Sequence, residues 1–163
     1  MGMVRIFRHL FSPSWRVRTA FPAHAMKAIE AAIKASENTH AGEVRFAVEA
    51  ALHPIALARG QSARERALEV FSRLRIWDTE HNNGVLIYLL LAERDVEIIA
   101  DRGIHQKVGG WEPICRAMET AFREGRFEQG VIAGIGAVRE HLVRHYPRQG
   151  GERNELPDQP VVL

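Results

Sequence analysis

The sequence predicts a single α/β domain, a three-layer α/β/α sandwich around a short mixed β-sheet. Three observations support this prediction. An apolar run at 85–92 has no polar face, as in a strand covered on both sides. Helical repeats of apolar residues lie on either side of it, and a short polar turn at 93–95 joins it to a second strand. The length of 163 residues is usual for one domain.

The first helix and strand of the domain are expected at 22–36 and 44–50. Pro22 suits the first helical position, where its missing N–H costs nothing. An apolar stripe at helical spacing follows, formed by Met26, Ile29 and Ile33. At 44–50 apolar residues alternate with charged ones, which predicts a half-buried strand.

The second helix is expected to begin at Ser62. Ser62 and Glu65 have the spacing of a capping box, in which each side chain satisfies a free backbone N–H. Leu68, Phe71 and Leu74 then fall on one face. Because this helix connects the strands at 44–50 and 85–92, the usual right-handed crossover makes those strands parallel.

The second half of the chain is expected to contain a hairpin and two helices. The strand at 96–100 follows the previous strand so closely that the two must be antiparallel. Helical patterns then run from Trp111 to about Gly125 and from about Glu128 to His145. Three glycines in the last helix predict close helix-to-sheet contact: Gly130, Gly134 and Gly136.

The domain is expected to span 22–146, with segments of different character at each end. Residues 1–21 form a basic, aromatic N-terminal arm. Arginines and aromatic rings suit an anionic membrane surface. The alternative is a short helix that packs its rings on the domain, and the break at 12–14 favours it. From Pro147 on, the chain is polar and rich in Gly and Pro, which predicts a disordered tail over 147–163.

Charge and hydropathy limit the partners that we expect. The net charge is +2, and no basic stripe runs through the predicted fold, which argues against nucleic acid. Arginines interrupt the first twenty residues, so they lack the apolar stretch of a secretion signal. The run at 85–92 is far shorter than the ~20 residues that cross a bilayer. We therefore expect a cytoplasmic protein. We also expect a protein partner, which the sequence does not identify.

Polar side chains gather at what the topology makes one end of the sheet. They are His40 and Glu43 before the first strand, Asp78, Glu80, His81, Asn82 and Asn83 before the second, and Asp101, Arg102, Gly103 and His105 after the third. With the hairpin centred on Arg94, Asn83 and His105 are expected to face each other. Sites in open α/β sheets lie where loops converge at strand ends. This loop cluster is the candidate site.

The loop cluster has two interpretations. Carboxylate and amide oxygens suit a hard cation such as Ca²⁺ or Mg²⁺. The candidate ligands are Glu43, Asp78, Glu80, Asn82, Asn83 and Asp101. Alternatively, these are turn residues that tolerate left-handed backbone and bond their own chain, and on the residues alone this interpretation is favoured. Of the loop histidines His40, His53, His81 and His105, no two have zinc-site spacing. Neither a nucleophile elbow nor a phosphate-binding glycine loop is present.

The stretch 81–87, followed by 94–98 and by Gly103-Ile104, resembles the TPM domain family. The likeness covers about Met26 to His145. This family includes plant thylakoid lumen proteins involved in photosystem II repair. Some relatives are described as acid phosphatases, others as divalent-metal binders or as accessory subunits. The resemblance implies the same α/β/α fold and a site in the loop cluster.

The acidic positions that the resemblance associates with this site are only partly present. Asn82 stands where relatives often carry aspartate, His105 where they often carry glutamate, and Gly109-Gly110 near a further usual aspartate. Each change removes a negative charge that would hold a hard cation. The resemblance therefore implies a binding or accessory module with a partly lost acidic site. The alternative is a weak metal-dependent phosphatase. There Asp78 or Asp101 would be metal ligand or nucleophile, Arg102 would clamp phosphate, and His105 would be the general acid.

Overall fold

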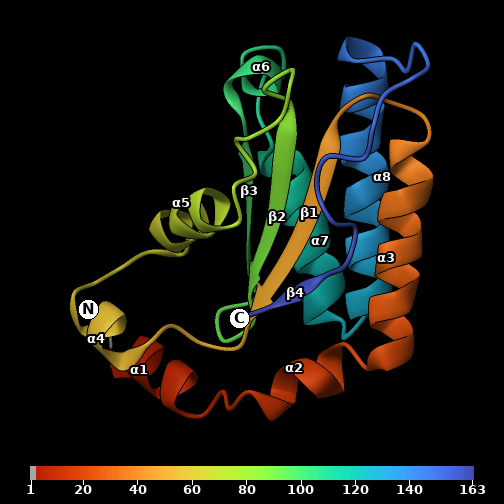
Figure 1. The fold of residues 1–163 in the computed structure, drawn as a ribbon. Coiled ribbons are helices and arrows are strands. Elements are labelled where there is room, and N and C mark those ends of the chain that lie inside the picture. Colours follow the sequence, from red (N-terminus) through yellow and green to blue (C-terminus); the bar gives the residue numbers. More distant parts are fainter. Residues whose placement is uncertain (1–2) are drawn as a thin grey trace.

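The computed structural model describes residues 3–163 and has the predicted three layers (Figure 1). The elements follow in the order α1 (Met3–Leu10), α2 (Trp15–Ala20), α3 (Ala23–Glu37), β1 (Glu43–Glu49), α4 (Pro54–Ala58), α5 (Ala63–Arg73), β2 (Gly84–Leu90), β3 (Asp95–Ala100), α6 (Arg102–His105), α7 (Glu112–Arg123), α8 (Phe127–His145) and β4 (Val161–Val162). Helices α3, α7 and α8 cover one face of the sheet, and α5 packs on the other. The α/β/α prediction is confirmed.

The sheet is mixed, with strand order β3-β2-β1-β4. Strands β1 and β2 are parallel and begin together, with Glu43 opposite Gly84. Strands β2 and β3 form the predicted antiparallel hairpin. Strand β2 is buried along its whole length, as its uninterrupted apolar run predicts.

The register of the hairpin differs from the prediction. Leu90 pairs with Asp95 and Val85 with Ala100, so the turn is centred between residues 92 and 93 rather than on Arg94. The ladder ends at Ala100, and the chain then turns into α6. His105 therefore does not face Asn83. The four-residue turn is centred elsewhere than predicted, and residue 105 lies beyond the end of the ladder.

Strand β1 is buried on both faces, although its alternating charges predicted a half-buried strand. Two of these charged side chains, Glu49 and Arg45, form hydrogen bonds inside the fold. Arg66 of α5 binds the Glu49 carboxylate through two nitrogens, at 2.8 and 3.0 Å, and the Tyr88 hydroxyl donates to it at 2.6 Å. Arg45 donates to the carbonyl of Pro157 in the C-terminal segment.

Helix α5 begins with the predicted capping box, and both of its hydrogen bonds are present. Its fully buried residues are the small Ala63, Ala67 and Val70, and Phe71 and Leu74 of the predicted face are partly buried against the same core. Leu68 is 47% exposed. Small side chains let α5 approach the sheet closely, which the spacing of the larger residues did not indicate.

The glycines of α8 serve a contact between helices rather than the predicted contact with the sheet. A Cβ at Gly130 would lie 2.7 Å from the Phe122 ring, and one at Gly134 would lie 2.3 Å from Met118 Sδ, both on α7. A Cβ at Gly136 would meet nothing within 4 Å. Only two of the three glycines therefore mark a close approach.

The C-terminal segment, defined as residues 147–163, is ordered, contrary to the predicted disordered tail. It runs along the outer edge of β1, where it forms β4 (Figure 1). Ala47 pairs with Val161, and the Leu163 N–H donates to the Val48 carbonyl at 3.0 Å. The polar composition misled the prediction because the segment is held by backbone pairing and buried charges rather than by an apolar face of its own.

The N-terminal arm forms α1 and α2 below the sheet, and Met1 and Gly2 of the predicted arm lie outside the described residues. Phe21 is buried among core residues, with its ring 5.6 Å from that of Phe46. The other aromatic rings of the arm, those of Phe7, Phe11 and Trp15, are exposed. The preferred expectation that the arm packs its rings on the domain holds only for Phe21. Within residues 3–163, the helices are all too short or too polar to cross a membrane.

Candidate functional site

The structure brings the three polar loops together at the end of the sheet where β1 and β2 begin. The Asp101 N–H donates to the Gly84 carbonyl at 2.8 Å, and the Gly103 N–H donates to the Asn82 carbonyl at 2.9 Å. A Cβ at Gly103 would lie 2.6 Å from that same carbonyl oxygen, so only glycine lets the two loops approach this closely. The Asn83 amide also donates to the Ala41 carbonyl at 3.0 Å.

Several of the predicted catalytic side chains do not point into a shared site. Arg102 and His105 are exposed on the short helix α6. Asp78 is exposed too, and its carboxylate forms an ion pair with Arg75 at 2.6 Å. Asn82 has φ 51°, the left-handed backbone that the turn interpretation expects.

Asp101 and Asn83 each keep one unused oxygen. Asp101 caps α6, because its Oδ1 accepts from the Arg102 N–H at 2.7 Å. Its Oδ2 is buried and has no hydrogen-bond partner among the described residues. The same is true of Oδ1 of Asn83, whose residue is fully buried. A buried oxygen without a donor costs free energy, so these two atoms are the strongest sign of a ligand in the loop cluster.

The Glu43 carboxylate and the Glu80 backbone N–H bind the C-terminal segment. Both oxygens of Glu43 accept backbone N–H groups, from Glu155 at 3.0 Å and from Leu156 at 3.1 Å. The Glu80 N–H in turn donates to the Glu155 carboxylate at 3.0 Å. Burial raises the pKa of Glu43 to about 7, although the two N–H groups oppose this rise.

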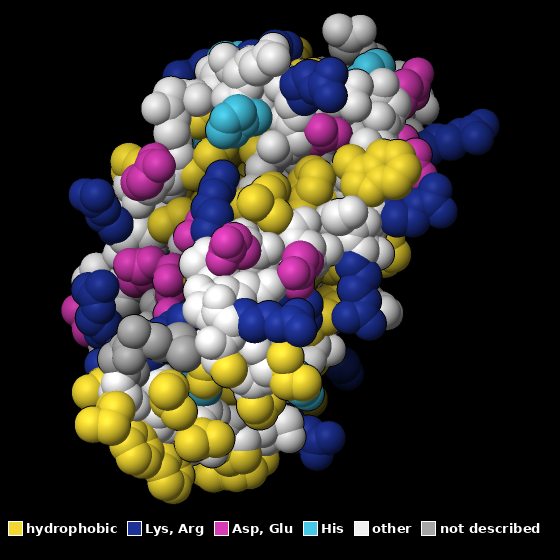
Figure 2. Space-filling view, turned by 90° about the vertical axis from the view of Figure 1, so that its left-hand side faces the viewer, with side chains coloured by type: hydrophobic (Ala, Val, Ile, Leu, Met, Phe, Trp, Pro, Cys, Tyr) yellow, Lys and Arg dark blue, Asp and Glu magenta, His cyan; other side chains and the backbone are white. Residues whose placement is uncertain are grey.

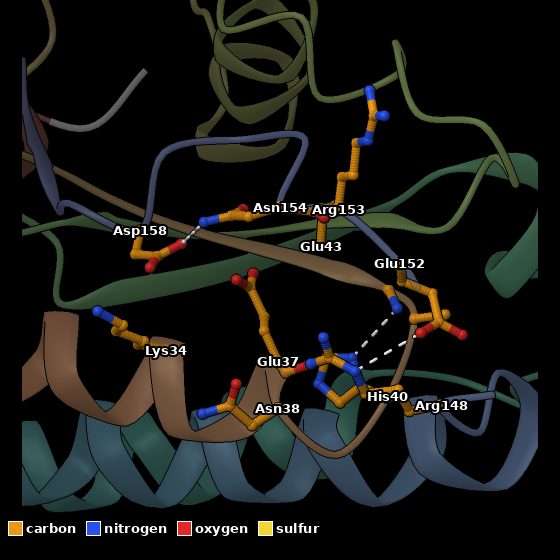
Figure 3. A pocket seen from close by; sticks show the side chains of 12 residues that line it. Lys34, Glu37, Asn38, His40, Glu43, Arg148, Glu152, Arg153, Asn154 and Asp158 are labelled. Atoms are coloured by element: carbon orange, nitrogen blue, oxygen red, sulfur yellow. Dashed lines mark hydrogen bonds and ion pairs between the residues drawn. The ribbon is translucent and has the colours of Figure 1, made fainter. Parts of the chain in front are cut away.

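A polar cavity lies between the end of α3, the start of β1 and the C-terminal segment (Figure 3). Its volume is about 140 Å³. The lining side chains come from two parts of the chain that are far apart in sequence. Residues 34–43 contribute Lys34, Glu37, Asn38, His40 and Glu43, and the C-terminal segment contributes Arg148, Glu152, Arg153, Asn154 and Asp158. The cavity is therefore lined by charges of both signs.

Burial shifts the pKa values of two side chains that line this cavity, Glu37 and His40, toward their neutral forms. Burial raises the pKa of Glu37 to about 9, against the Val44 N–H that donates to it, and the charges of Glu43 and Asp158 raise it further. Burial lowers the pKa of His40 to about 4. At neutral pH both groups are uncharged, as expected for residues that hold the structure together.

The predicted ligands do not fit a divalent cation. Hard cations bind several oxygens at once, usually with carboxylates among them. Throughout residues 3–163, the structure contains no group of three or more His, Cys, Asp or Glu side chains arranged to hold a metal. Asp78 and Glu43 are occupied by the chain itself, and Asp101 offers one oxygen.

Sequence reasoning missed the part of the site that the C-terminal segment supplies. Arg148, Glu152 and Asp158 line the cavity together with Glu37 of α3. The signal was the alternation of acidic and basic residues after Pro147, which is unusual for a flexible tail. Because the segment was predicted to be disordered, its residues were not predicted to belong to a site.

The family model of the TPM domain matches residues 19–141 of the chain. Among solved structures, the NMR structure of the BA42 protein from the psychrophilic bacterium Bizionia argentinensis is similar, with a TM-score of 0.78 and 29% identity. The match covers 88% of this chain and 95% of that one. The N-terminal domain of a P. gingivalis protein has a TM-score of 0.59 and 19% identity, over 85% and 95% of the two chains, and shows the fold alone. None of the curated proteins compared with the chain matches it.

Proposed function

The chain belongs to the TPM domain family, and we propose that it acts there as a binding or accessory module rather than as an efficient hydrolase. One observation carries this proposal. The carboxylates of Glu43 and Asp78 are engaged by the chain's own backbone and side chains, and Asp101 uses one oxygen to cap α6, which leaves it one free oxygen. A catalytic centre would instead keep a nucleophile and a base free and within hydrogen-bond distance of each other.

The loop cluster and the adjoining cavity are the proposed binding face. Exposed residues of both signs surround it, including Asp78, Arg102 and His105. Lys34 and Arg153 stand at the cavity. A mixed polar rim suits the contacts of a transient protein interface, in which complementary charges set orientation more than affinity. The ligand class that we propose is a polar loop of a protein partner.

A specific observation supports the second candidate, a weak metal-dependent phosphatase. Oδ2 of Asp101 is buried without a partner, next to the exposed guanidinium-bearing Arg102. In this alternative Asp101 is the nucleophile or a cation ligand, Arg102 binds phosphate oxygens, and His105 protonates the leaving group. The exposure of Arg102 and His105 gives this reading less support than the binding module.

Hydrolysis of a phosphomonoester separates the two functions. The full chain is assayed with p-nitrophenyl phosphate in the presence of Mg²⁺, Ca²⁺ or Mn²⁺, alongside Asp101→Asn and the control Asp158→Asn. A binding module gives the same background rate for all three proteins. Turnover that needs the metal and disappears only in Asp101→Asn would establish the phosphatase instead.

A further inference from the structure

Helix α1 is attached to the domain by its polar side. Arg5 donates to the Glu93 carboxylate at 2.7 Å and to the Gln61 carbonyl at 2.6 Å. His9 Nδ1 accepts the Leu52 N–H at 3.0 Å, so its Nε2 carries the proton and donates to Glu93 at 2.6 Å. Burial raises the pKa of Glu93, but the hydrogen bonds from His9 and Arg5 outweigh it and lower the pKa. These contacts fix the rotation of the helix.

The opposite side of α1 is apolar and faces solvent. At 100° per residue, the apolar side chains of this side fall within about 120° of arc. They are Met3, Val4, Phe7, Leu10 and Phe11, and all are more than half exposed. Figure 2 shows hydrophobic side chains gathered at the lower end of the molecule, where α1 and α4 lie. An amphipathic helix normally packs such an apolar stripe against the core. The exposed stripe of α1 therefore indicates a surface that binds a partner.

The start of α2 continues this surface and adds positive charge. Trp15 is 61% exposed. Arg8, Arg16 and Arg18 are also exposed. The first acidic residue of the chain is Glu30. Apolar, aromatic and basic side chains therefore share one surface, residues 3–18, that contains no acid.

The arm is held in place at its far end as well. Val17 and Phe21 are buried in the main core, and the Phe21 ring lies 5.6 Å from the rings of both Phe46 and Phe127. Anchored by Glu93 at one end and by the core at the other, the arm presents its apolar side as a fixed surface. Docking then costs less conformational entropy than ordering a free tail would.

We propose that residues 3–18 form a lipid-docking surface for anionic bilayers. The rings of Phe7, Phe11 and Trp15 would enter the zone between headgroups and acyl chains, where aromatic side chains are favoured. The guanidinium groups of Arg8 and Arg18 would meet lipid phosphates. Charge complementarity selects this occupant, because the surface carries only positive charge.

The same charge argues against a second copy of the chain as the occupant. A symmetric dimer through this surface would set the patch against itself and bring the arginines of both copies together. Like charges opposed in this way are repulsive. An anionic membrane instead neutralises them.

Co-sedimentation of the full chain with vesicles tests the lipid-docking surface. We expect binding to vesicles of phosphatidylcholine and phosphatidylglycerol, and at least tenfold weaker binding to phosphatidylcholine alone. Each arginine at an anionic surface contributes roughly fivefold in affinity, so Arg8→Gln with Arg18→Gln should lose more than tenfold. Phe7→Ser with Phe11→Ser should lose at least tenfold as well.

Matched controls use exposed residues at the other end of the molecule. Val143→Ser and Arg144→Gln, both on α8, should leave vesicle binding unchanged. No binding to either vesicle, or equal binding by Phe7→Ser with Phe11→Ser, overturns the proposal. A dimer in analytical ultracentrifugation that this aromatic double variant dissociates, with no vesicle binding by the unmodified chain, would assign the surface to a second copy and overturn it too.

Discussion

The carboxylate of Glu43, at the start of β1, accepts the backbone N–H of Glu155, 112 residues later in the chain, at 3.0 Å. The Leu156 N–H donates to the other oxygen at 3.1 Å. One buried side chain thus holds the C-terminal segment against the sheet, at the position where a cation ligand was predicted. The predicted cation ligand Glu43 therefore has a structural task in this chain.

Glu43→Ala should release the C-terminal segment. The substitution leaves two backbone N–H groups without acceptors, which costs about 1–3 kcal/mol each while they stay buried. We expect the segment to detach rather than accept this cost, so amide hydrogen exchange at 155–163 should quicken. Glu80→Ala is the control, because only the Glu80 backbone N–H bonds the segment. Unchanged protection in Glu43→Ala would contradict the role of Glu43.

The free energy of unfolding should fall between pH 7 and pH 9, and Glu37 should cause the fall. Its pKa is raised by burial to about 9, from 4.5 in an unfolded chain, so the folded state holds a proton that the unfolded state has lost. The stability from this proton is complete below pH 4.5 and is lost as pH rises through 9. His40, with its pKa lowered to about 4, acts in the opposite sense but only below pH 6.5.

Urea denaturation at a series of pH values measures this effect. Glu37→Gln, which resembles the protonated acid, should flatten the decline between pH 7 and pH 9. Glu152→Gln, in the same cavity, should leave it unchanged, since the backbone N–H of Gln149 lowers rather than raises the pKa of Glu152. A decline that persists in Glu37→Gln would assign the titration to another group.

Glu49→Ala should destabilise the domain by about 3 kcal/mol or more. It leaves the Arg66 guanidinium partly buried without its main partner and removes the acceptor of the Tyr88 hydroxyl. Glu69→Ala removes an exposed partner of Arg66 and an exposed acceptor of the Gln61 amide, and should cost less than about 1 kcal/mol. Thermal unfolding distinguishes them, at about 2–4 °C per kcal/mol for a domain of this size. Equal shifts in the two variants would show that the buried pair contributes nothing special.

Removing residues 159–163 should expose the edge of β1. Val161 and Val162 pair with Ala47 and Val48, and the Leu163 N–H adds a further hydrogen bond to that edge. An unpaired, apolar strand edge promotes association between copies. We therefore expect the shortened chain to self-associate in light scattering, whereas Val162→Ser, which keeps the backbone pairing, should stay as the full chain does. A shortened chain that matches the full chain would contradict the protective role of β4.

The central elements of the fold followed from local sequence signals. The apolar run of β2 indicates a strand covered on both sides, and the Ser62 and Glu65 capping box marks the start of α5. These features act over a few residues, so spacing alone reveals them. The burial of β1 does not follow from its own pattern, because Arg45 and Glu49 find their hydrogen-bond partners far away in sequence.

The convergence of the three polar loops was predicted, but the contacts of their side chains were not. Loops before β2 and after β3 converge because the hairpin fixes both ends, and this much the topology determines. Because the centre of the turn was predicted at the wrong residue, His105 was wrongly expected to face Asn83. The cavity under the C-terminal segment depends on contacts such as the hydrogen bond from the Val44 N–H to Glu37. It also depends on β4, a two-residue strand that is too short to be predicted from a sequence pattern. Long-range charge pairing has no local signature.

An NMR titration with Mg²⁺ and Ca²⁺ tests the central claim most directly, namely that the carboxylates of Glu43 and Asp78 hold the chain's own contacts and the loop cluster does not bind a cation. Amide shifts of the full chain are followed at 78–83 and 101–105, with Asp101→Asn as the comparison. The account predicts no saturable shift in either segment. Saturable shifts confined to these segments, and lost in Asp101→Asn, would contradict it and establish a cation site at the loop cluster.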